Sequence, residues 1–259
     1  DTTVHYPGGT VSEPFVEITL RMMSSFSPDQ DYSFDFQKSE ARVRSKGYSR
    51  ETIHYLVEPD ATAASYFMTL PVSIGGSCEV EGIFATMLQG DADYGTVLKN
   101  IGLKVEFNER GVKTLKNGGL GGGSYDFNAI SDTFLSLAAV SPLLEQPIAI
   151  SGIAHTRKQE TDRVGAMATE LRRLGQAVEE SNDQLRITQN LKQLKRLASD
   201  GIEIETYHDH RFAMSFAVLG CHDLLGDGRP WLRIRNPNCC SKTFPNFFQK
   251  LELLREQSL

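Results

Sequence analysis

The hydrophobic and polar positions of the chain repeat in three similar blocks. Each block opens with an aspartate and a run of small and apolar residues: DATAASYFMTLPVSIGG from Asp60, DTFLSLAAVSPLLEQP from Asp132 and DHRFAMSFAVLGCHDLLGDG from Asp209. The runs from Asp132 and Asp209 leave no polar face, which predicts helices buried on all sides. Three such runs at similar spacing indicate an internal structural repeat.

Each apolar run is followed by a short strand candidate and then by a second, amphipathic helix. The strand candidates are CEVEGI (78–83), IAISGI (148–153) and WLRIRNP (231–237), and the helix candidates are DADYGTVLKNIG (91–102), ETDRVGAMATELRRLG (160–175) and KTFPNFFQKLELL (242–254). Pairs of strand-like pieces close the first two blocks, at 103–107 and 111–115 and at 177–181 and 184–189. This order predicts an α/β (α+β) fold with three βαβαββ units, because helices and strands do not alternate singly as in a doubly wound sheet.

Residues 1–57 have the pattern of the last part of another such unit. PFVEITLRMMSSF (14–26) places Phe15, Ile18, Met22 and Phe26 on one helical face, and DYSFDFQ (31–37) alternates like a strand. We place a boundary at VEPD (57–60), which separates a partial unit of a second domain (1–57) from a three-unit domain (58–259). The chain begins at Asp1 without a methionine, and we expect further sequence upstream.

Composition and charge exclude some classes of function. The chain has 259 residues and a net charge of −6, so its surface as a whole gives no electrostatic reason to expect nucleic acid, and any anion site must be local. Four cysteines, two of them adjacent, are typical of a reduced cytoplasmic protein rather than a disulfide scaffold. No segment has the apolar length of a membrane span or the pattern of a targeting peptide.

The charges at the predicted helix starts are unusual. The start of a helix favours carboxylates and disfavours cations, so Asp60 and Asp132 are expected as ordinary helix caps. Arg163, Arg211 and Lys242 are predicted at the starts of their helices, where cations are unfavourable. An anionic ligand would explain them, because backbone N–H groups and side-chain cations would then converge on it.

Simpler interpretations of these residues stay open. Glu160 and Arg163 are three residues apart and could form an ordinary surface salt bridge. YHDH (207–210) and Cys239–Cys240 could suggest a metal site, but adjacent cysteines lack the spacing of zinc ligands. NGGLGGGS (117–124) lacks the Gly-Lys-Ser/Thr ending of a phosphate loop, which favours a flexible connection.

Six motifs in sequence resemble those of the EPSP synthase (3-phosphoshikimate 1-carboxyvinyltransferase) family. They are SEPFVEITLRMM (12–23), YLVEPDATAASYF (55–67), SDTFLSLAA (131–139), ETDRVGAMATELRRLG (160–175), DHRFAMSF (209–216) and SKTFPNFF (241–248), and they cover essentially the whole chain. The resemblance implies an enolpyruvyl-transferase-like fold of two domains, each with three repeat units, whose helix N-termini point into the cleft between the domains.

The resemblance also implies a reaction, in which the enolpyruvyl group of phosphoenolpyruvate moves to the 5-hydroxyl of shikimate 3-phosphate and phosphate is released. By family match Asp132 binds the shikimate hydroxyls and is the candidate base, and Glu160 is the candidate proton donor and acceptor at the methylene carbon. Arg163, Arg211 and Lys242 are expected to hold phosphoenolpyruvate. No metal and no organic cofactor is implied.

Other positions implied by the resemblance concern shikimate 3-phosphate. Ser12 matches a family position that contacts this substrate. Phe15 replaces a tyrosine that many members direct to the shikimate phosphate, Gln159 stands where a lysine is frequent, and His155 where an asparagine is frequent. These departures affect how shikimate 3-phosphate is held.

The family's N-terminal Lys-Ser motif, its glycine-rich phosphoenolpyruvate loop and its Ser-Ser-Gln loop are not in this sequence. We therefore expect about half of an active site, completed by the N-terminal part of the same enzyme, and negligible turnover by the chain alone. Three alternatives stay open: an inactive fragment or binding module of the same fold, the enolpyruvyl transferase that acts on UDP-N-acetylglucosamine, and, more distantly, a nucleic-acid role through the related repeat fold of RNA cyclases.

Overall fold

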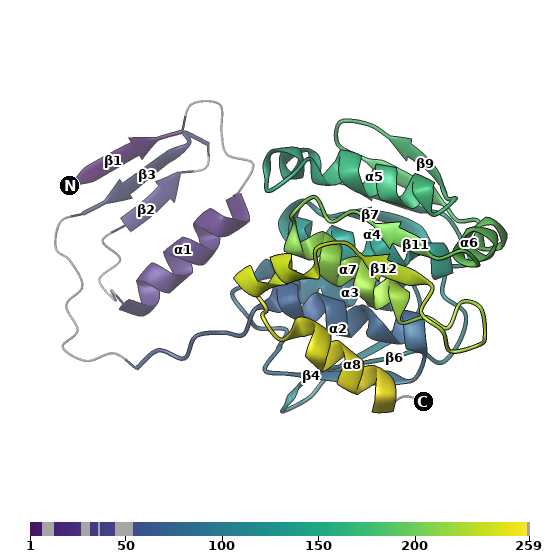
Figure 1. Ribbon diagram of the computed structural model, residues 1–259. Helices are drawn as coiled ribbons and strands as arrows, with labels where there is room; N and C mark the ends of the chain where they lie inside the picture. Colours follow the sequence, from purple (N-terminus) through teal and green to yellow (C-terminus); the bar gives the residue numbers. More distant parts are fainter. Residues whose placement is uncertain (7–12, 27–31, 36, 45–53, 258–259) are drawn as a thin grey trace. The chain divides into compact units, whose positions relative to one another are not determined.

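The computed structural model describes residues 1–6, 13–26, 32–35, 37–44 and 54–257. The chain divides into two compact units (Figure 1). The first comprises Asp1–Glu58 with Leu88–Gly90, and the second comprises Pro59–Met87 with Asp91–Leu259.

The first unit contains one helix and a small antiparallel sheet. The helix is α1 (Glu13–Phe26), and the strands β1 (Thr2–His5), β2 (Tyr32–Asp35) and β3 (Glu40–Val43) are ordered β1-β3-β2. The helix predicted at 14–26 and the strand predicted at 31–37 are both present within the described residues. Phe15 and Met22 of the predicted apolar face are nevertheless 62% and 40% exposed, so this face of α1 is not buried.

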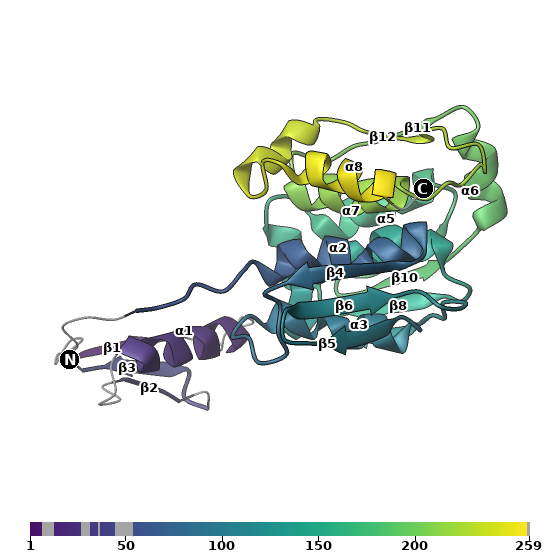
Figure 2. The same ribbon diagram turned by 90° about the horizontal axis from the view of Figure 1, so that it is seen from below.

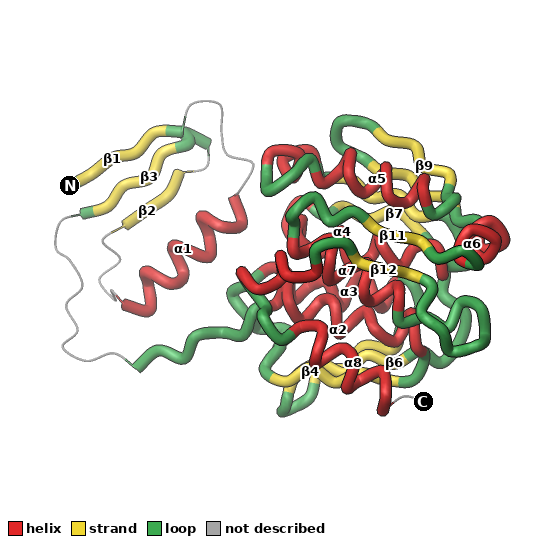
Figure 3. Tube along the Cα trace, in the orientation of Figure 1, coloured by secondary structure: helices red, strands yellow, loops and turns green. Residues whose placement is uncertain are grey.

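The second unit contains the three predicted repeats (Figure 3). The first has α2 (Ala61–Ile74), β4 (Ser77–Glu81), α3 (Tyr94–Asn100), β5 (Lys104–Phe107) and β6 (Gly111–Leu115). The second has β7 (Gly123–Asp126), α4 (Phe134–Val140), β8 (Ile148–Ser151), α5 (Arg163–Arg173), β9 (Ala177–Glu180) and β10 (Leu185–Thr188). The third has α6 (Leu191–Ala198), β11 (Ile202–Ile204), α7 (His210–Gly220), β12 (Leu232–Ile234) and α8 (Phe247–Gln257).

The strands of each repeat form a sheet of their own. The strand orders are β4-β6-β5, β7-β8-β10-β9 and β11-β12. The pairs β7–β8 and β11–β12 are parallel and each is joined through a helix, whereas the remaining pairs of these sheets are antiparallel. The second repeat therefore shows the whole predicted βαβαββ order, although β7, α6 and β11 were not predicted.

The core of the second unit is built on one apolar helix from each repeat. Helices α2, α4 and α7 pack against one another, and Figure 2 shows α2 and α7 between strands β4–β6 on one side and β11–β12 on the other. Every residue of α4 is buried, as are all residues of α7 except Arg211 and Gly220, which confirms the prediction that these helices are buried on all sides. One polar contact links α2 and α4 inside this core, where Ser65 Oγ and Ser136 Oγ share a hydrogen bond of 2.8 Å.

The glycine-rich stretch at 117–124 is a connection, as predicted, but it is packed against its surroundings. Leu120 is buried, and the backbone N–H of Gly121 donates to the carbonyl of Ile101 at 2.8 Å. A side chain at Gly122 would place its Cβ 2.1 Å from the carbonyl oxygen of Pro147, so this position requires glycine for close approach of two backbones. Among the described residues, no helix is long and apolar enough to span a bilayer.

Candidate functional site

Asp132 lies where the starts of two helices meet. Its Oδ1 accepts a hydrogen bond from Arg163 Nη1 at 2.8 Å, and its Oδ2 accepts one from Arg211 Nη2 at 2.7 Å. The prediction that Asp132 caps a helix is wrong, because α4 begins two residues later and Asp132 belongs to a short 3-10 helix (Asn128–Thr133). Its carboxylate is therefore free of the capping role and joins two cations instead.

Arg163 and Arg211 lie where the sequence predicts them. Arg163 is the first residue of α5, and Arg211 is the second residue of α7. Arg163 is only 3% exposed, a position in which a cation requires paired carboxylates. Its Nε donates to Asp209 Oδ2 at 2.7 Å, while its Nη1 donates to Asp132 and to Gln159 Oε1.

Asp209 was not among the predicted site residues, yet it holds the centre of the cluster. This fully buried carboxylate is the N-cap of α7: its Oδ1 accepts the backbone N–H of Arg211 at 2.8 Å, and its Oδ2 pairs with Arg163. One carboxylate thereby fixes a helix start and a buried cation at the same time. The sequence indicated the capping role, because Asp209 directly precedes the apolar run of α7. Nothing in the sequence indicated the ion pair of Asp209 with Arg163.

Burial and neighbouring groups set the charge of Arg211 and of a second acid. Burial lowers the pKa of Arg211, but Tyr66 and Asp132 outweigh this effect and raise it, so Arg211 stays a cation. Burial raises the pKa of Asp91 to about 6, against the opposing effect of a hydrogen bond from Thr62 Oγ1. The negative charge of the nearby Asp132 contributes to this rise. Sequence reasoning did not single out Asp91, which lies at the start of a predicted amphipathic helix.

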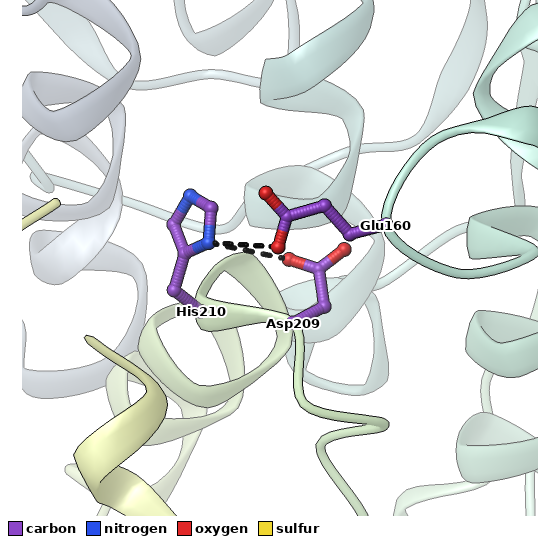
Figure 4. Close-up of side chains that lie close together, drawn as sticks. All are labelled: Glu160, Asp209 and His210. Carbon is purple, nitrogen blue, oxygen red and sulfur yellow. Dashed lines mark ion pairs between the residues drawn. The ribbon is translucent and has the colours of Figure 1, made fainter. Parts of the chain in front are cut away.

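Glu160 and His210 face each other at the edge of the cluster. Figure 4 shows His210 directed at two carboxylates, with its Nδ1 3.3 Å from Glu160 Oε2 and 3.9 Å from Asp209 Oδ1. Burial lowers the pKa of His210, and the Arg211 cation lowers it further, so the imidazole is neutral at pH 7. Sequence reasoning weighed His210 only as a metal ligand.

Glu160 is also paired with a cation. Its Oε1 accepts a hydrogen bond from Lys242 Nζ. Burial raises the pKa of Glu160, but the hydrogen bond from Lys242 and the charges of Lys242 and Arg163 outweigh burial and lower it, so Glu160 is an anion.

The same three residues bring together atoms that could hold a metal ion. Ligand atoms of Glu160, Asp209 and His210 all lie within 4.8 Å of one another. Both Asp209 oxygens already accept bonds, however, and Arg163, Arg211 and Lys242 surround the cluster, so a cation would have to compete with these groups. His208, another member of the metal set considered from the sequence, points its Nδ1 to Asn236 Nδ2 at 3.1 Å instead.

Lys242 reaches the cluster from a different element than predicted. It was expected at the start of the last helix, but α8 begins at Phe247, and Lys242 ends a 3-10 helix (Pro237–Lys242). Pro245 lies between them and favours an extended conformation in the residue before it, which separates the two helical segments. The side chain of Lys242 is 63% exposed, so it is the most accessible cation of the cluster.

The remaining predicted residues have varied positions. His155 Nε2 and Ser131 Oγ share a hydrogen bond of 2.9 Å beside Asp132, and Gln159 contacts Arg163. Ser12 lies outside the described residues. Arg157, which was not among the predicted site residues, donates to Asp162 and Glu180 at 2.8 and 3.0 Å and so stabilises the entry to α5.

The cluster combines three cations with three carboxylates, at the starts of α5 and α7 and in the segments beside them. Arg163, Arg211 and Lys242 balance Asp132, Glu160 and Asp209, while His210 is neutral. An anionic ligand would therefore bind by replacing a carboxylate as the partner of a cation. The exposed Lys242–Glu160 pair is the easiest one to exchange, because exposed ion pairs contribute little stability.

Comparisons with known proteins give one consistent family. The model of the EPSP synthase (3-phosphoshikimate 1-carboxyvinyltransferase) family matches residues 1–251. The 3-phosphoshikimate 1-carboxyvinyltransferase of Opitutus terrae is 47% identical over 95% of this chain and 52% of its own length, and that of Hamiltonella defensa is 37% identical over 98% and 56%. The chain thus spans about half the length of the curated relatives that it matches.

Solved structures share the fold. EPSP synthase from Acinetobacter baumannii has a TM-score of 0.67 at 23% identity and covers 98% of this chain and 56% of its own. The enolpyruvyl transferase NikO from Streptomyces tendae has a TM-score of 0.62 at 15% identity, over 98% of this chain and 55% of its own. These likenesses confirm the predicted fold class.

Proposed function

The chain belongs to the EPSP synthase family, and on this premise we propose that it forms one wall of an active site that transfers the enolpyruvyl group of phosphoenolpyruvate to shikimate 3-phosphate. The observation that carries the proposal is the convergence of Arg163, Arg211 and Lys242 on two carboxylates, Asp132 and Glu160. Both substrates are polyanions, and phosphate and carboxylate groups are what arginine forks and helix N-termini bind.

The residues then take distinct roles. Arg163, Arg211 and Lys242 hold the phosphate and carboxylate of phosphoenolpyruvate. Asp132 binds the shikimate hydroxyls and accepts the proton of the attacking 5-hydroxyl, while Glu160 gives a proton to the methylene carbon and takes one back when phosphate leaves. No metal or organic cofactor enters this scheme.

The pairing of Glu160 suggests how it acquires a proton. Its low pKa in the free protein depends on the hydrogen bond from Lys242 and on nearby positive charge. When Lys242 turns to the substrate, that bond is lost and the pKa of Glu160 rises. Substrate binding would in this way prepare the proton donor.

Shikimate 3-phosphate is expected to be held in a way particular to this chain. His155 and Gln159 stand where the family resemblance led us to expect asparagine and lysine, and they contact Ser131 and Arg163. We propose that both contact the shikimate ring or its substituents, together with Ser12. The rest of the site comes from the N-terminal part of the same enzyme, in keeping with the half-length match to the relatives. A cytoplasmic location completes the proposal, and it rests on the cysteine pattern of the sequence.

Phosphate release tests the function. The chain is mixed with the N-terminal half of the 47% identical Opitutus terrae relative, which supplies the part that this chain does not match. With phosphoenolpyruvate and shikimate 3-phosphate, we expect release only when both parts are present. Release by the chain alone would contradict the one-wall proposal, and no release by a pair that forms a stable complex would contradict the proposed function.

The same assay separates the alternatives. Release with UDP-N-acetylglucosamine in place of shikimate 3-phosphate would assign the chain to the sister reaction. Binding of phosphoenolpyruvate by the assembled pair, without turnover of either acceptor, would make the chain a binding module.

A further inference from the structure

A second buried carboxylate lies on the helix that carries Arg163, away from the cation cluster. Glu170, in the middle of α5, is only 1% exposed. Its Oε1 accepts a hydrogen bond from Tyr207 Oη at 2.8 Å, and its Oε2 accepts bonds from Arg173 Nη1 at 2.6 Å and from the backbone N–H of Glu205 at 3.3 Å. The function proposed above uses none of these groups.

The partner of Glu170 lies in an unusual piece of backbone. Tyr207 and His208 have φ values of 54° and 59°, the left-handed region that residues other than glycine rarely adopt. Such conformations persist where surrounding contacts hold them, and they concentrate at functional sites. The next three residues are Asp209, His210 and Arg211, so this turn determines where they lie.

The contacts of Glu170 are directed at this turn. Arg173, which Glu170 binds, also donates from Nη2 to the carbonyl of Glu203 at 2.8 Å, which ties α5 to β11. The bonds of Glu170 go further along the chain, to Glu205 and Tyr207. Burial raises the pKa of Tyr207, and Glu170 raises it further, so the hydroxyl keeps the proton that it donates.

The Tyr207 ring also contacts the helix that follows. It packs edge-on against Phe212 of α7, with ring centroids 5.6 Å apart. Tyr207 therefore joins the start of α7 to the middle of α5, while Asp209 and Arg163 join the same two helices at their starts. The two connections together fix the relative position of Arg163 and Arg211.

We propose that Glu170 and Tyr207 are a pair of positioning residues, which hold the left-handed turn before Asp209 and so set the place of Arg163 and Arg211 for an anionic substrate. The inference rests on the proposed function for the identity of that anion, phosphoenolpyruvate. Neither residue contacts the substrate, and both act through the turn.

The test compares Tyr207→Phe with Tyr125→Phe in the full chain. Tyr125 is a matched control, because its hydroxyl also donates one hydrogen bond, to the carbonyl of Gly122 at 2.9 Å, outside the cluster. Phosphoenolpyruvate affinity is measured by calorimetric titration, and stability by thermal unfolding. Tyr207→Phe is expected to weaken phosphoenolpyruvate binding about tenfold, whereas Tyr125→Phe should bind with the wild-type affinity. The Tm of Tyr207→Phe should fall no more than that of Tyr125→Phe. Equal affinities of the two variants would overturn the inference.

Two Glu170 variants separate positioning from general stability. A glutamine can still accept a bond from the Tyr207 hydroxyl, whereas an alanine cannot. Glu170→Gln should therefore keep most of the affinity and Glu170→Ala should lose at least as much as Tyr207→Phe. Equal affinity of Glu170→Gln and Glu170→Ala would contradict the role of the Tyr207 bond.

A second readout decides the inference if the wild-type chain binds no phosphoenolpyruvate, a result that would count against the proposed function. Hydrogen exchange of the Arg163 Nε–H and of the Arg211 backbone N–H, both bonded to Asp209, is followed by NMR. Exchange should be at least tenfold faster in Tyr207→Phe and unchanged in Tyr125→Phe. Unchanged exchange in Tyr207→Phe would overturn the positioning role whatever the ligand is.

Discussion

At the scale of single residues, the cluster depends on carboxylates that serve more than one partner. Asp132 joins two arginines, and Asp209 joins one arginine and a helix start. Removing one partner from a buried pair is costly, because it leaves the other charge without compensation. The three cations can therefore be held close together before any substrate arrives.

Asp91 gives a prediction in pH. Its pKa of about 6 in the folded protein lies above the ordinary 3.8, so the folded state binds the proton more tightly than the unfolded chain. Stability from this group is complete below about pH 4 and is lost as the pH rises to about 6. An asparagine at this position cannot ionise, so Asp91→Asn removes this loss of stability. The free energy of unfolding of the variant should exceed that of the wild type by about 2–3 kcal/mol at pH 7.5 and by almost nothing at pH 3.8.

Urea unfolding at the two pH values measures this difference. Asp93→Asn, on the same 3-10 helix but with an exposed side chain, is the control and should change stability by less than ~0.5 kcal/mol at both. A gain by Asp91→Asn that is equal at pH 3.8 and 7.5 would contradict the raised pKa.

The sequence predicted which residues of the site carry charge but not how they pair. Arginines in the first turn of a helix are recognisable, because they break a simple electrostatic rule. The contacts of Asp132 with Arg163 and Arg211 join positions far apart in the chain, and no local pattern indicates them. The missed role of Asp209 has the same cause.

At the scale of elements, periodicity predicted the repeat and most of its helices and strands. The strand β7 was missed because GSYD, which follows a run of glycines, has no clear alternation. The short helix α6 and strand β11 fall in a charged stretch between two predicted blocks. The misplaced Lys242 shows a limit of the same method, since a segment that contains Pro245 was predicted as the start of one continuous helix.

The start of α5 gives the prediction at this scale. Asp162 accepts the backbone N–H of Gly165 at 2.9 Å and also binds Arg157 through both oxygens. Asp162→Ala should therefore cost about 1.5–2 kcal/mol of unfolding free energy, more than the ~1 kcal/mol of an ordinary cap. Asn190→Ala, which removes only the cap of α6, is the matched control. Equal losses in denaturant unfolding would show that the Arg157 pair contributes nothing.

At the scale of the whole molecule, the second unit presents its chemistry at the starts of α5 and α7 and in two 3-10 segments. The three repeats are held together because one apolar helix from each, α2, α4 and α7, packs against the others. The chain matches about half the length of its curated relatives. Its described residues contribute the cations Arg163, Arg211 and Lys242 to the site. The central claim is that this group alone recognises phosphoenolpyruvate.

Titration of the chain with phosphoenolpyruvate tests that claim most directly. Lys242→Met removes an accessible cation of the cluster, and Lys250→Met makes the same change of charge on the exposed surface of α8. A charge-assisted hydrogen bond of about 1.5–3 kcal/mol corresponds to a loss of roughly 10- to 100-fold in affinity. We predict binding by the wild type and by Lys250→Met, and this loss in Lys242→Met. Equal affinities of the two variants, or no binding by the wild type, would contradict the account.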